Sequence, residues 1–272
     1  MSSHWPEEKV ESIDDFQKKV VARAGHAELV FRGQANAEWD LQTSIDRPSR
    51  IDTTTAAANE YEDRLRDEGE LIKAFTTKAW RLLGALEQHY SDQQGPRVSR
   101  MAVMQHFGAP TRLLDWTHSP TVAAYFACID EDTKDGAIWW FNREILEEVL
   151  SGRWLDFGFT RAQNINFDER VFSPTVPSFV APVYLPIPFS RASAQRGLFT
   201  LGSRLGCLHD DLLSGLLPDG TYGRLRIHAL LKSTAISVLA SLAVDAISLQ
   251  YNGADRCGLE MSWERRPQDA TR

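Results

Sequence analysis

The sequence predicts an α+β fold in which a small mixed or antiparallel sheet is flanked by helices. Segments with apolar residues at helical spacing alternate with short segments in which apolar residues recur at every second position. No internal repeat and no long linker divides the 272 residues. We therefore expect one domain over residues 1–272. The composition, 43% hydrophobic and 25% charged, is ordinary for a globular protein.

Helical spacing marks five segments of the chain. They are residues 7–24, 57–90, 98–107, 120–128 and 233–249. Pro120 stands where the first turn of its helix is expected, with Ser119 or Thr117 as the N-cap. The apolar face of the last segment fits either a buried core or a dimer interface.

Strand patterns occupy the stretches between these helices. Residues 28–33, 136–141 and 221–232 are predicted as strands, and residues 111–117 as a strand or a turn. Five prolines between residues 174 and 188 limit residues 165–190 to loops and short edge strands.

The charge balance and the cysteines exclude several classes of protein. Lys and Arg number 30 against 37 Asp and Glu, so the chain lacks the basic surplus of a general nucleic-acid backbone binder. Three cysteines without a CxxC pair predict neither a disulfide framework nor a zinc knuckle. The first residues have no signal-peptide core, and no apolar run reaches the roughly 20 residues of a membrane span. We expect a cytoplasmic protein with no membrane partner.

Residues 105–120 contain the densest group of chemically active side chains. Gly108 and Pro110 fix the backbone there, and the polar residues beyond them precede a predicted helix N-terminus, which favours anions. The structural alternative is an ion pair between Arg112 and Asp115 with a helix cap. The candidate residues of this group are Gln105, His106, Arg112, Asp115, Trp116 and Thr117.

A second feature is the sequence FRGQ at residues 31–34. Arg32 leaves a predicted strand beside Gly33, where its planar guanidinium is suited to a phosphate or carboxylate. The alternative is an ordinary surface arginine in a tight turn.

Together, FRGQ and QHFGAPTRLLDWTHSPTVAAYFA at residues 105–127 resemble the FRG domain, a prokaryotic family named for the first motif. Arg47, the strand GAIWWF and the sequence AQRGLF at residues 194–199 also match that family's pattern. The resemblance spans about residues 12–250 and implies a single FRG-type domain over residues 1–272 with its core in that span. The family's prokaryotic setting suggests a toxin or an antiphage effector.

The order of these motifs is also similar to that of arginine-class ADP-ribosyltransferases. That resemblance implies that Arg32, with Gly33 and Gln34, binds the diphosphate or ribose of NAD. It also implies that Asp115 and Thr117 bind the nicotinamide end of NAD. In the same resemblance Trp116 stacks on the nicotinamide or supports the pocket, and Gln195 lies near the position of the catalytic glutamate. Arg112 is a further candidate for binding NAD. His106 is a candidate proton-transfer group.

We therefore expect an enzyme that uses NAD as a substrate and needs no metal, either transferring ADP-ribose to a macromolecule or hydrolysing NAD. Gln195 brings no negative charge, so Asp115 or Glu169 is expected to supply the carboxylate. Two alternatives stay open: a non-catalytic module that recognises a nucleotide or a nucleic-acid end, and a metal-dependent nuclease toxin. The nuclease would gather Asp115, His106 and His118 around its metal.

Overall fold

The computed structural model describes residues 5–47, 60–79, 96–153, 156–157, 171–183 and 197–249. Within these ranges the chain has seven α-helices and seven strands joined in one mixed sheet, so the α+β prediction is confirmed. The chain divides into two compact units, residues 1–42 with 114–251 and residues 43–113 with 252–272. Each unit is described by itself.

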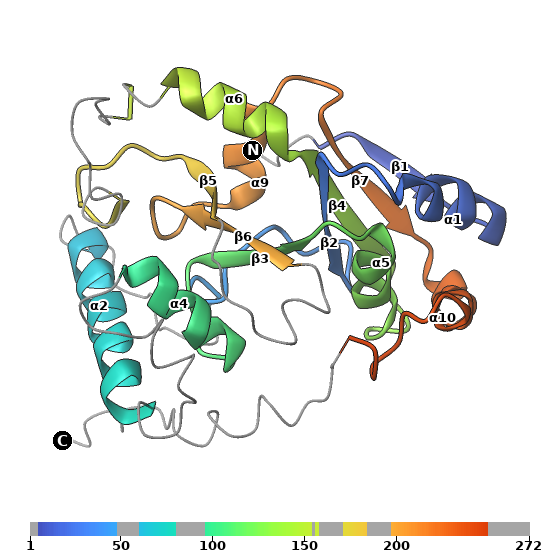
Figure 1. Ribbon diagram of the computed structural model, residues 1–272, viewed down its shortest axis with the longest axis horizontal. Helices are drawn as coiled ribbons and strands as arrows, with labels where there is room; N and C mark the ends of the chain where they lie inside the picture. The colour runs from blue at the N-terminus through green and yellow to red at the C-terminus, as the bar shows by residue number, and fades with distance from the viewer. Residues whose placement is uncertain are drawn as a thin grey trace. The chain divides into compact units, whose positions relative to one another are not determined.

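The sheet has the strand order β1-β7-β4-β2-β3-β6-β5 (Figure 1). Strand β1 runs parallel to β7, whereas β2 is antiparallel to both β4 and β3, and β4 is antiparallel to β7. Strand β5 is antiparallel to β6. The strands are β1 Glu7–Val10, β2 Leu29–Gln34, β3 Leu113–Thr117, β4 Gly136–Asn142, β5 Val180–Val183, β6 Gly197–Gly202 and β7 Tyr222–Ile227.

The helices begin and end close to the sequence signals where a cap is present. Ser119 is the N-cap of α5, since its hydroxyl accepts the N–H of Val122, and Pro120 occupies the first turn. The helices are α1 Ile13–Lys19, α2 Glu60–Ala79, α4 Arg97–His106, α5 Pro120–Cys128, α6 Arg143–Arg153, α9 His209–Leu216 and α10 Lys232–Ser241.

None of these helices, within the described ranges, has both the length and the apolar composition required to cross a bilayer.

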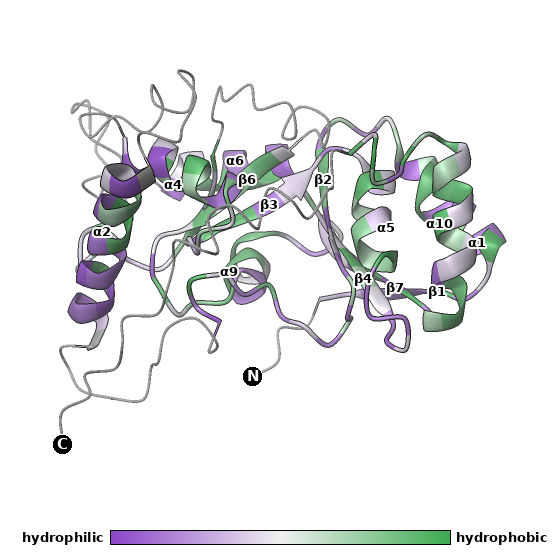
Figure 2. Cartoon of the chain, turned by 90° about the horizontal axis from the view of Figure 1, so that it is seen from below, coloured by the Kyte–Doolittle hydropathy of each residue, from purple (hydrophilic) through white to green (hydrophobic). Residues whose placement is uncertain are grey.

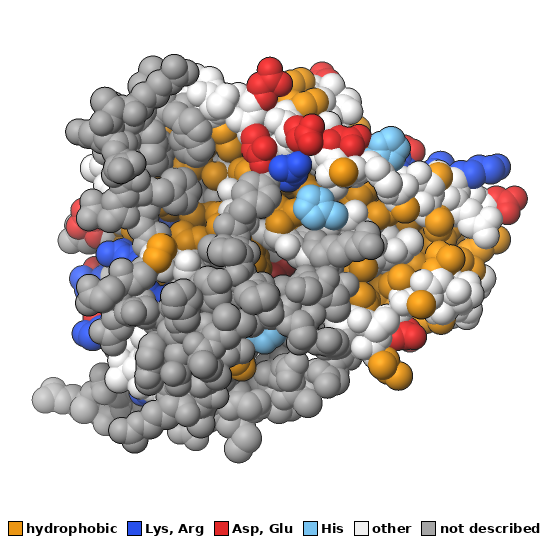
Figure 3. All heavy atoms as spheres, viewed as in Figure 1, with side chains coloured by type: hydrophobic (Ala, Val, Ile, Leu, Met, Phe, Trp, Pro, Cys, Tyr) orange, Lys and Arg blue, Asp and Glu red, His pale blue; other side chains and the backbone are white. Residues whose placement is uncertain are grey.

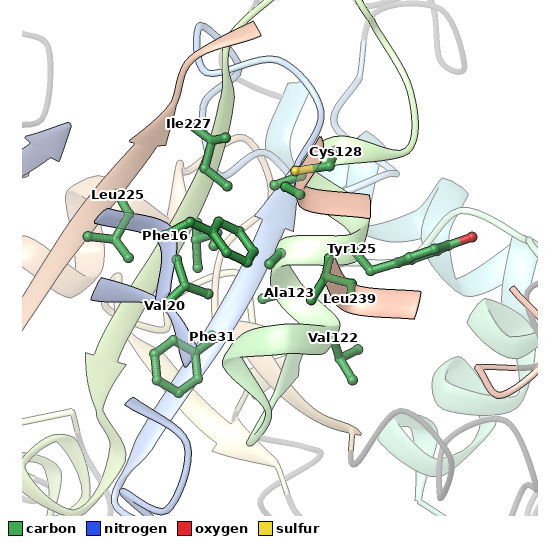
Figure 4. Close-up of a cluster of buried hydrophobic side chains, with 14 of the residues drawn as sticks. Phe16, Val20, Phe31, Val122, Ala123, Tyr125, Cys128, Leu225, Ile227 and Leu239 are labelled. Carbon is green, nitrogen blue, oxygen red and sulfur yellow. The ribbon is translucent and has the colours of Figure 1, made fainter. Parts of the chain in front are cut away.

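One face of the sheet is covered by α1, α5 and α10, which bury a single apolar cluster against β2, β4 and β7 (Figure 4). Hydrophobic residues of the three neighbouring helices are green in Figure 2. Helix α5 lies so close to β2 that a Cβ on Gly33 would stand 1.8 Å from the carbonyl oxygen of Ala123. Only glycine fits at this position, because any side chain would enter the backbone of the helix.

The second unit contains α2 and α4. Phe75 of α2 and Phe107, which directly follows α4, lie with their ring centroids 6.5 Å apart. The predicted helix over residues 57–90 is therefore confirmed for Glu60–Ala79, and its remaining residues lie outside the described ranges.

The structure corrects the predicted helix over residues 7–24. Its first part, Glu7–Val10, is an edge strand instead, and α1 begins only at Ile13. Glu7 pairs in register with Arg224 of β7 and forms ion pairs with Arg224 and Arg226. Long-range pairing thus overrides the local helical spacing.

Two further boundaries differ from the prediction, and three elements were missed. Strand β7 ends at Ile227, although the predicted strand ran to residue 232. Helix α10 ends at Ser241, although the predicted helix ran to residue 249, and Ala243 shortly after it has a left-handed φ of 57°. Strand β6 and helices α6 and α9 were not predicted. The region of prolines contributes the short strand β5, as expected.

Candidate functional site

The side chains of β2 alternate between the two faces of the sheet. Phe31 belongs to the apolar cluster beneath α5, so Arg32 points to the opposite face. On that face the neighbour of Arg32 is Trp139 of β4, which stands directly opposite Arg32 in the strand register. The sequence-predicted arginine therefore lies in the middle of the sheet and not in a surface turn.

Arg32 contacts Asp115, although 83 positions separate the two residues. Its Nη1 donates a hydrogen bond to the backbone oxygen of Asp115 at 2.8 Å and lies 3.8 Å from the carboxylate Oδ2. The Arg32 side chain is 16% exposed, whereas that of Asp115 is 60% exposed. A cation that is mostly buried thus lies beside a carboxylate that faces solvent.

The way in which β2 and β3 join explains this exposure. Within the described residues a single pair, Phe31 opposite Thr117, links the two strands. Asp115 lies two residues before this pair, and it is the one exposed residue of β3. The arrangement places a guanidinium and a carboxylate where two central strands separate.

The two residues that follow Arg32 have packing partners of their own. Gly33 admits the backbone of α5, as described above. Gln34 is buried and accepts a hydrogen bond from the indole Nε1 of Trp139 at 2.6 Å. Its amide Nε2 donates to the backbone oxygen of Asp40 at 3.1 Å. These contacts account for both residues structurally and fix the strand that carries Arg32.

Comparison with known proteins identifies one family. Residues 27–136 match the family model of the FRG domain. The chain contains an FRG domain. No curated protein and no solved structure matches the chain.

The matched part of the FRG domain includes both residues of the contact just described. It begins before β2, covers β3 and α5, and ends at Gly136, where β4 starts. Arg32 and Asp115 therefore both lie within the FRG domain, while the sheet is completed by β4 to β7 beyond the match and by β1 before it.

Trp116 lies beside Asp115 in the FRG domain but is buried, with 2% exposure. Its ring meets Phe141 edge-on at 4.7 Å, and its Nε1 donates to the hydroxyl of Thr200 at 2.9 Å. The same hydroxyl lies 3.0 Å from Nδ1 of His209 at the start of α9. A buried chain of polar contacts thus connects β3, β6 and α9.

His209 lies fully buried at the end of this chain. Burial lowers the pKa of His209 to about 3, and the positive charge of Arg32 lowers it in the same direction. The imidazole is therefore neutral at pH 7, which avoids a second positive charge close to Arg32. Sequence analysis missed Thr200 and His209; the only local signal was a polar residue inside the apolar run GLFTLG.

Thr117 and Ser119 fix the turn from β3 into α5. The hydroxyl of Thr117 accepts the N–H of Ser119 at 3.0 Å, and the hydroxyl of Ser119 lies 2.9 Å from that of Thr121. Thr117 is 6% exposed. The predicted cap is thus present, and Thr117 helps to orient the strand end that follows Asp115.

Three other predicted residues belong to the second unit. Arg112 is 1% exposed and is held by the Glu68 carboxylate, with its Nε donating to Oε1 at 2.7 Å. Burial acts to lower the pKa of Arg112, but Glu68 raises it above its ordinary value. Arg112 therefore pairs with Glu68, whereas the structural alternative named Asp115 as its partner. Gln105 contacts the hydroxyl of Thr111, and His106 meets Phe107 edge-on at 5.0 Å.

The remaining candidates lie outside the described residues. These are Gln195, which was expected near the position of a catalytic glutamate, and Glu169. Within the described residues no three His, Cys, Asp or Glu side chains converge as a metal site requires. The contact between Arg32 and Asp115 supplies one guanidinium and one carboxylate, which are suited to binding an anion and to stabilising a nearby positive charge.

Proposed function

We propose that this protein is an NAD-consuming enzyme that transfers ADP-ribose to a macromolecule or hydrolyses NAD. The observation that carries the proposal is the contact between Arg32 and Asp115, a mostly buried cation beside an exposed carboxylate. NAD has an anionic diphosphate and a ribose on which positive charge develops as the glycosidic bond breaks, so a cation and a carboxylate at neighbouring positions suit it. The likeness in motif order to arginine-class ADP-ribosyltransferases supports the same choice.

In this proposal Arg32 binds the diphosphate of NAD. Its guanidinium offers a planar set of donors, and the neighbouring Trp139 and Gln34 hold β2 so that the donors keep a fixed position. A low local dielectric strengthens the attraction between a buried cation and a phosphate.

Asp115 acts on the reacting bond. When the bond between the ribose C1′ and the nicotinamide nitrogen breaks, both electrons stay with the nicotinamide and positive charge develops on the ribose. The carboxylate of Asp115 stabilises this charge, which is the role that a glutamate would have at the position of Gln195. A hydroxyl group, an amine, a nucleic-acid base or water then attacks C1′, and the attacking group releases its proton to solvent.

The test is incubation of the purified protein with NAD, with nicotinamide release followed by chromatography. We expect Asp115→Asn, which keeps the shape and removes the charge, to lower kcat by about 100- to 1000-fold with little change in KM. We expect Arg32→Ala to raise KM, with incomplete rescue by Arg32→Lys because lysine lacks the planar fork. Asp14→Asn, in the first turn of α1, is the matched control.

Three results would separate the alternatives. NAD binding that depends on Arg32 without any nicotinamide release would favour a recognition module, which the uncharged Gln195 also favours. Activity on nucleic acid that a chelator abolishes would favour a nuclease. A protein that neither binds NAD nor releases nicotinamide would overturn the proposal. Where nicotinamide release depends on Asp115, a toxin or antiphage role is tested by the effect of Asp115→Asn on cell growth.

A further inference from the structure

Residues 35–41, the loop that follows β2, are anchored from their first residue onward. The backbone oxygen of Ala35 accepts a hydrogen bond from the buried Nζ of Lys232 at 2.7 Å. The backbone oxygen of Ala37 accepts from Nη1 of Arg224 at 3.0 Å. Both cations reach the loop from elements more than 180 positions away in the sequence. The start of the loop is therefore fixed by the sheet and by α10.

The end of the same loop is fixed on the face of the sheet that carries Arg32. The backbone oxygen of Asp40 accepts from Gln34, and that of Leu41 accepts the N–H of His209 at 3.1 Å. Gln34 is two residues from Arg32 on the same face of β2, and His209 lies close enough to Arg32 for its charge to lower the pKa of the imidazole. The loop therefore returns to the surroundings of Arg32.

This anchored loop leaves one large aromatic side chain in solvent. Trp39 is 47% exposed, while its backbone N–H bonds to the carbonyl of Asn36 at 3.2 Å. Tryptophan has the largest apolar surface of any side chain, and exposing it on a fixed backbone forfeits burial. Exposed aromatic residues on rigidly held loops are typical of binding surfaces.

We propose that Trp39 is the stacking platform for the base of a nucleotide whose phosphate groups lie on Arg32. The proposal rests on the proposed function only in assigning phosphate binding to Arg32. In this proposal one ligand touches both residues, since Asp40 and Leu41, which follow Trp39, are hydrogen-bonded to Gln34 and to His209. A planar base adds stacking on the indole to the charge-assisted contact with the guanidinium.

The surroundings of Trp39 favour a base over an apolar protein surface. Glu38 and Asp40 on either side of it are exposed, so the indole is not part of a continuous hydrophobic patch. The carboxylate of Glu38 is paired with Arg226, whose Nη1 donates to Oε1 at 2.8 Å. The carboxylate of Asp40 repels phosphate and accepts hydrogen bonds from amino groups, which directs the base toward Trp39 and the phosphates toward Arg32. By contrast, the exposed hydrophobic residues Leu230 and Leu242 flank α10, where Figure 3 shows hydrophobic side chains together on the surface.

The experiment is calorimetric titration of the full chain with ADP-ribose and with pyrophosphate, which has no base. We expect Trp39→Ala to weaken ADP-ribose binding roughly 5- to 100-fold and to leave pyrophosphate binding unchanged. Trp39→Phe should restore most of the affinity, because a phenyl ring also stacks. Leu230→Ala, which removes another exposed hydrophobic side chain (82% exposed), is the matched control and should have no effect.

The proposal is overturned if the wild type does not bind ADP-ribose, or if Trp39→Ala binds ADP-ribose as tightly as the wild type does. It is overturned as well if Trp39→Ala weakens the binding of pyrophosphate as much as the binding of ADP-ribose. It is also overturned if Trp39→Phe behaves as Trp39→Ala. These outcomes are independent of nicotinamide release. NAD cleavage with no effect of Trp39 would leave the proposed function standing, whereas Trp39-dependent ADP-ribose binding without cleavage would leave only the platform.

Discussion

The two faces of strand β2 are built by different means. Phe31 and Gly33 face α5, where β2 meets a cluster of hydrophobic residues and the backbone of the helix. Arg32 and Gln34 face the other side, where Trp139 donates a hydrogen bond to Gln34 and stands opposite Arg32. Neighbouring residues of a single motif thus enter two different environments.

The difference separates what stabilises the fold from what positions the site. Apolar contacts are non-directional, so the face under α5 depends on volume and on how closely the backbones approach. Hydrogen bonds are directional, so the opposite face fixes particular orientations, among them those of Trp116 and of Arg32. Changes under α5 should therefore alter stability alone, whereas changes on the opposite face should also alter ligand binding.

The largest effect is expected at the closest approach on the apolar face. Gly33→Ala places a methyl group 1.8 Å from the carbonyl oxygen of Ala123, so α5 must move away from β2. We expect a loss of about 4 kcal/mol or more in the free energy of unfolding, measured with urea, or failure to fold.

Gly69→Ala is the control for this substitution. Gly69 lies inside α2, and a Cβ there would meet no atom within 4 Å. Alanine is the better helix former, so this variant should gain about 0.5–1 kcal/mol. Equal stabilities of the Gly33→Ala variant and the wild type would show that the approach of α5 to β2 is not tight.

Local signals predicted the part of the fold on which the apolar face depends. The alternation in residues 28–33 and the Ser119-Pro120 cap are readable within a few residues, and both elements were confirmed. The strand at Glu7–Val10 was predicted as a helix, because its pairing partner β7 lies more than 200 positions away. The hydrophobic pattern of such a short edge strand does not indicate which distant strand it pairs with.

The site was less predictable for the same reason. FRGQ and LLDWT marked Arg32 and Asp115 as candidates, but their contact spans 83 positions and only the sheet order reveals it. The bond from Trp116 to Thr200 spans 84 positions. Arg112 looked like a partner of Asp115 from its spacing, yet a buried arginine needs a buried carboxylate, which Glu68 provides.

A smaller effect is expected from the polar face, and it depends on pH. His209 has its pKa lowered to about 3 in the folded protein, against an ordinary value of 6.5. Below pH 6.5 the unfolded chain therefore binds a proton that the folded chain does not. Stability is fully present above pH 6.5 and falls by about 1.4 kcal/mol per pH unit as the pH decreases toward 3.

We expect the free energy of unfolding of His209→Asn to change by about 2 kcal/mol less than that of the wild type between pH 7 and pH 5. Urea unfolding at both pH values measures the difference. Thr200→Ser keeps the hydroxyl that lies beside His209 and should retain the wild-type pH dependence. The same pH dependence in His209→Asn as in the wild type would mean that His209 has the same pKa in the folded protein as in the unfolded chain.

The smallest effect tests whether the two faces are independent. Ser12 caps α1 by accepting the N–H of Asp15 at 3.1 Å, and α1 buries Phe16 in the apolar cluster. Ser12→Ala should lower the free energy of unfolding by about 1 kcal/mol, and Ser12→Asn should retain most of it. Because α1 lies on the face opposite Arg32, ADP-ribose affinity should stay at the wild-type value in both variants. A change in that affinity would show that strain in the apolar cluster reaches Arg32 through β2, and that the two faces of the strand act as one unit.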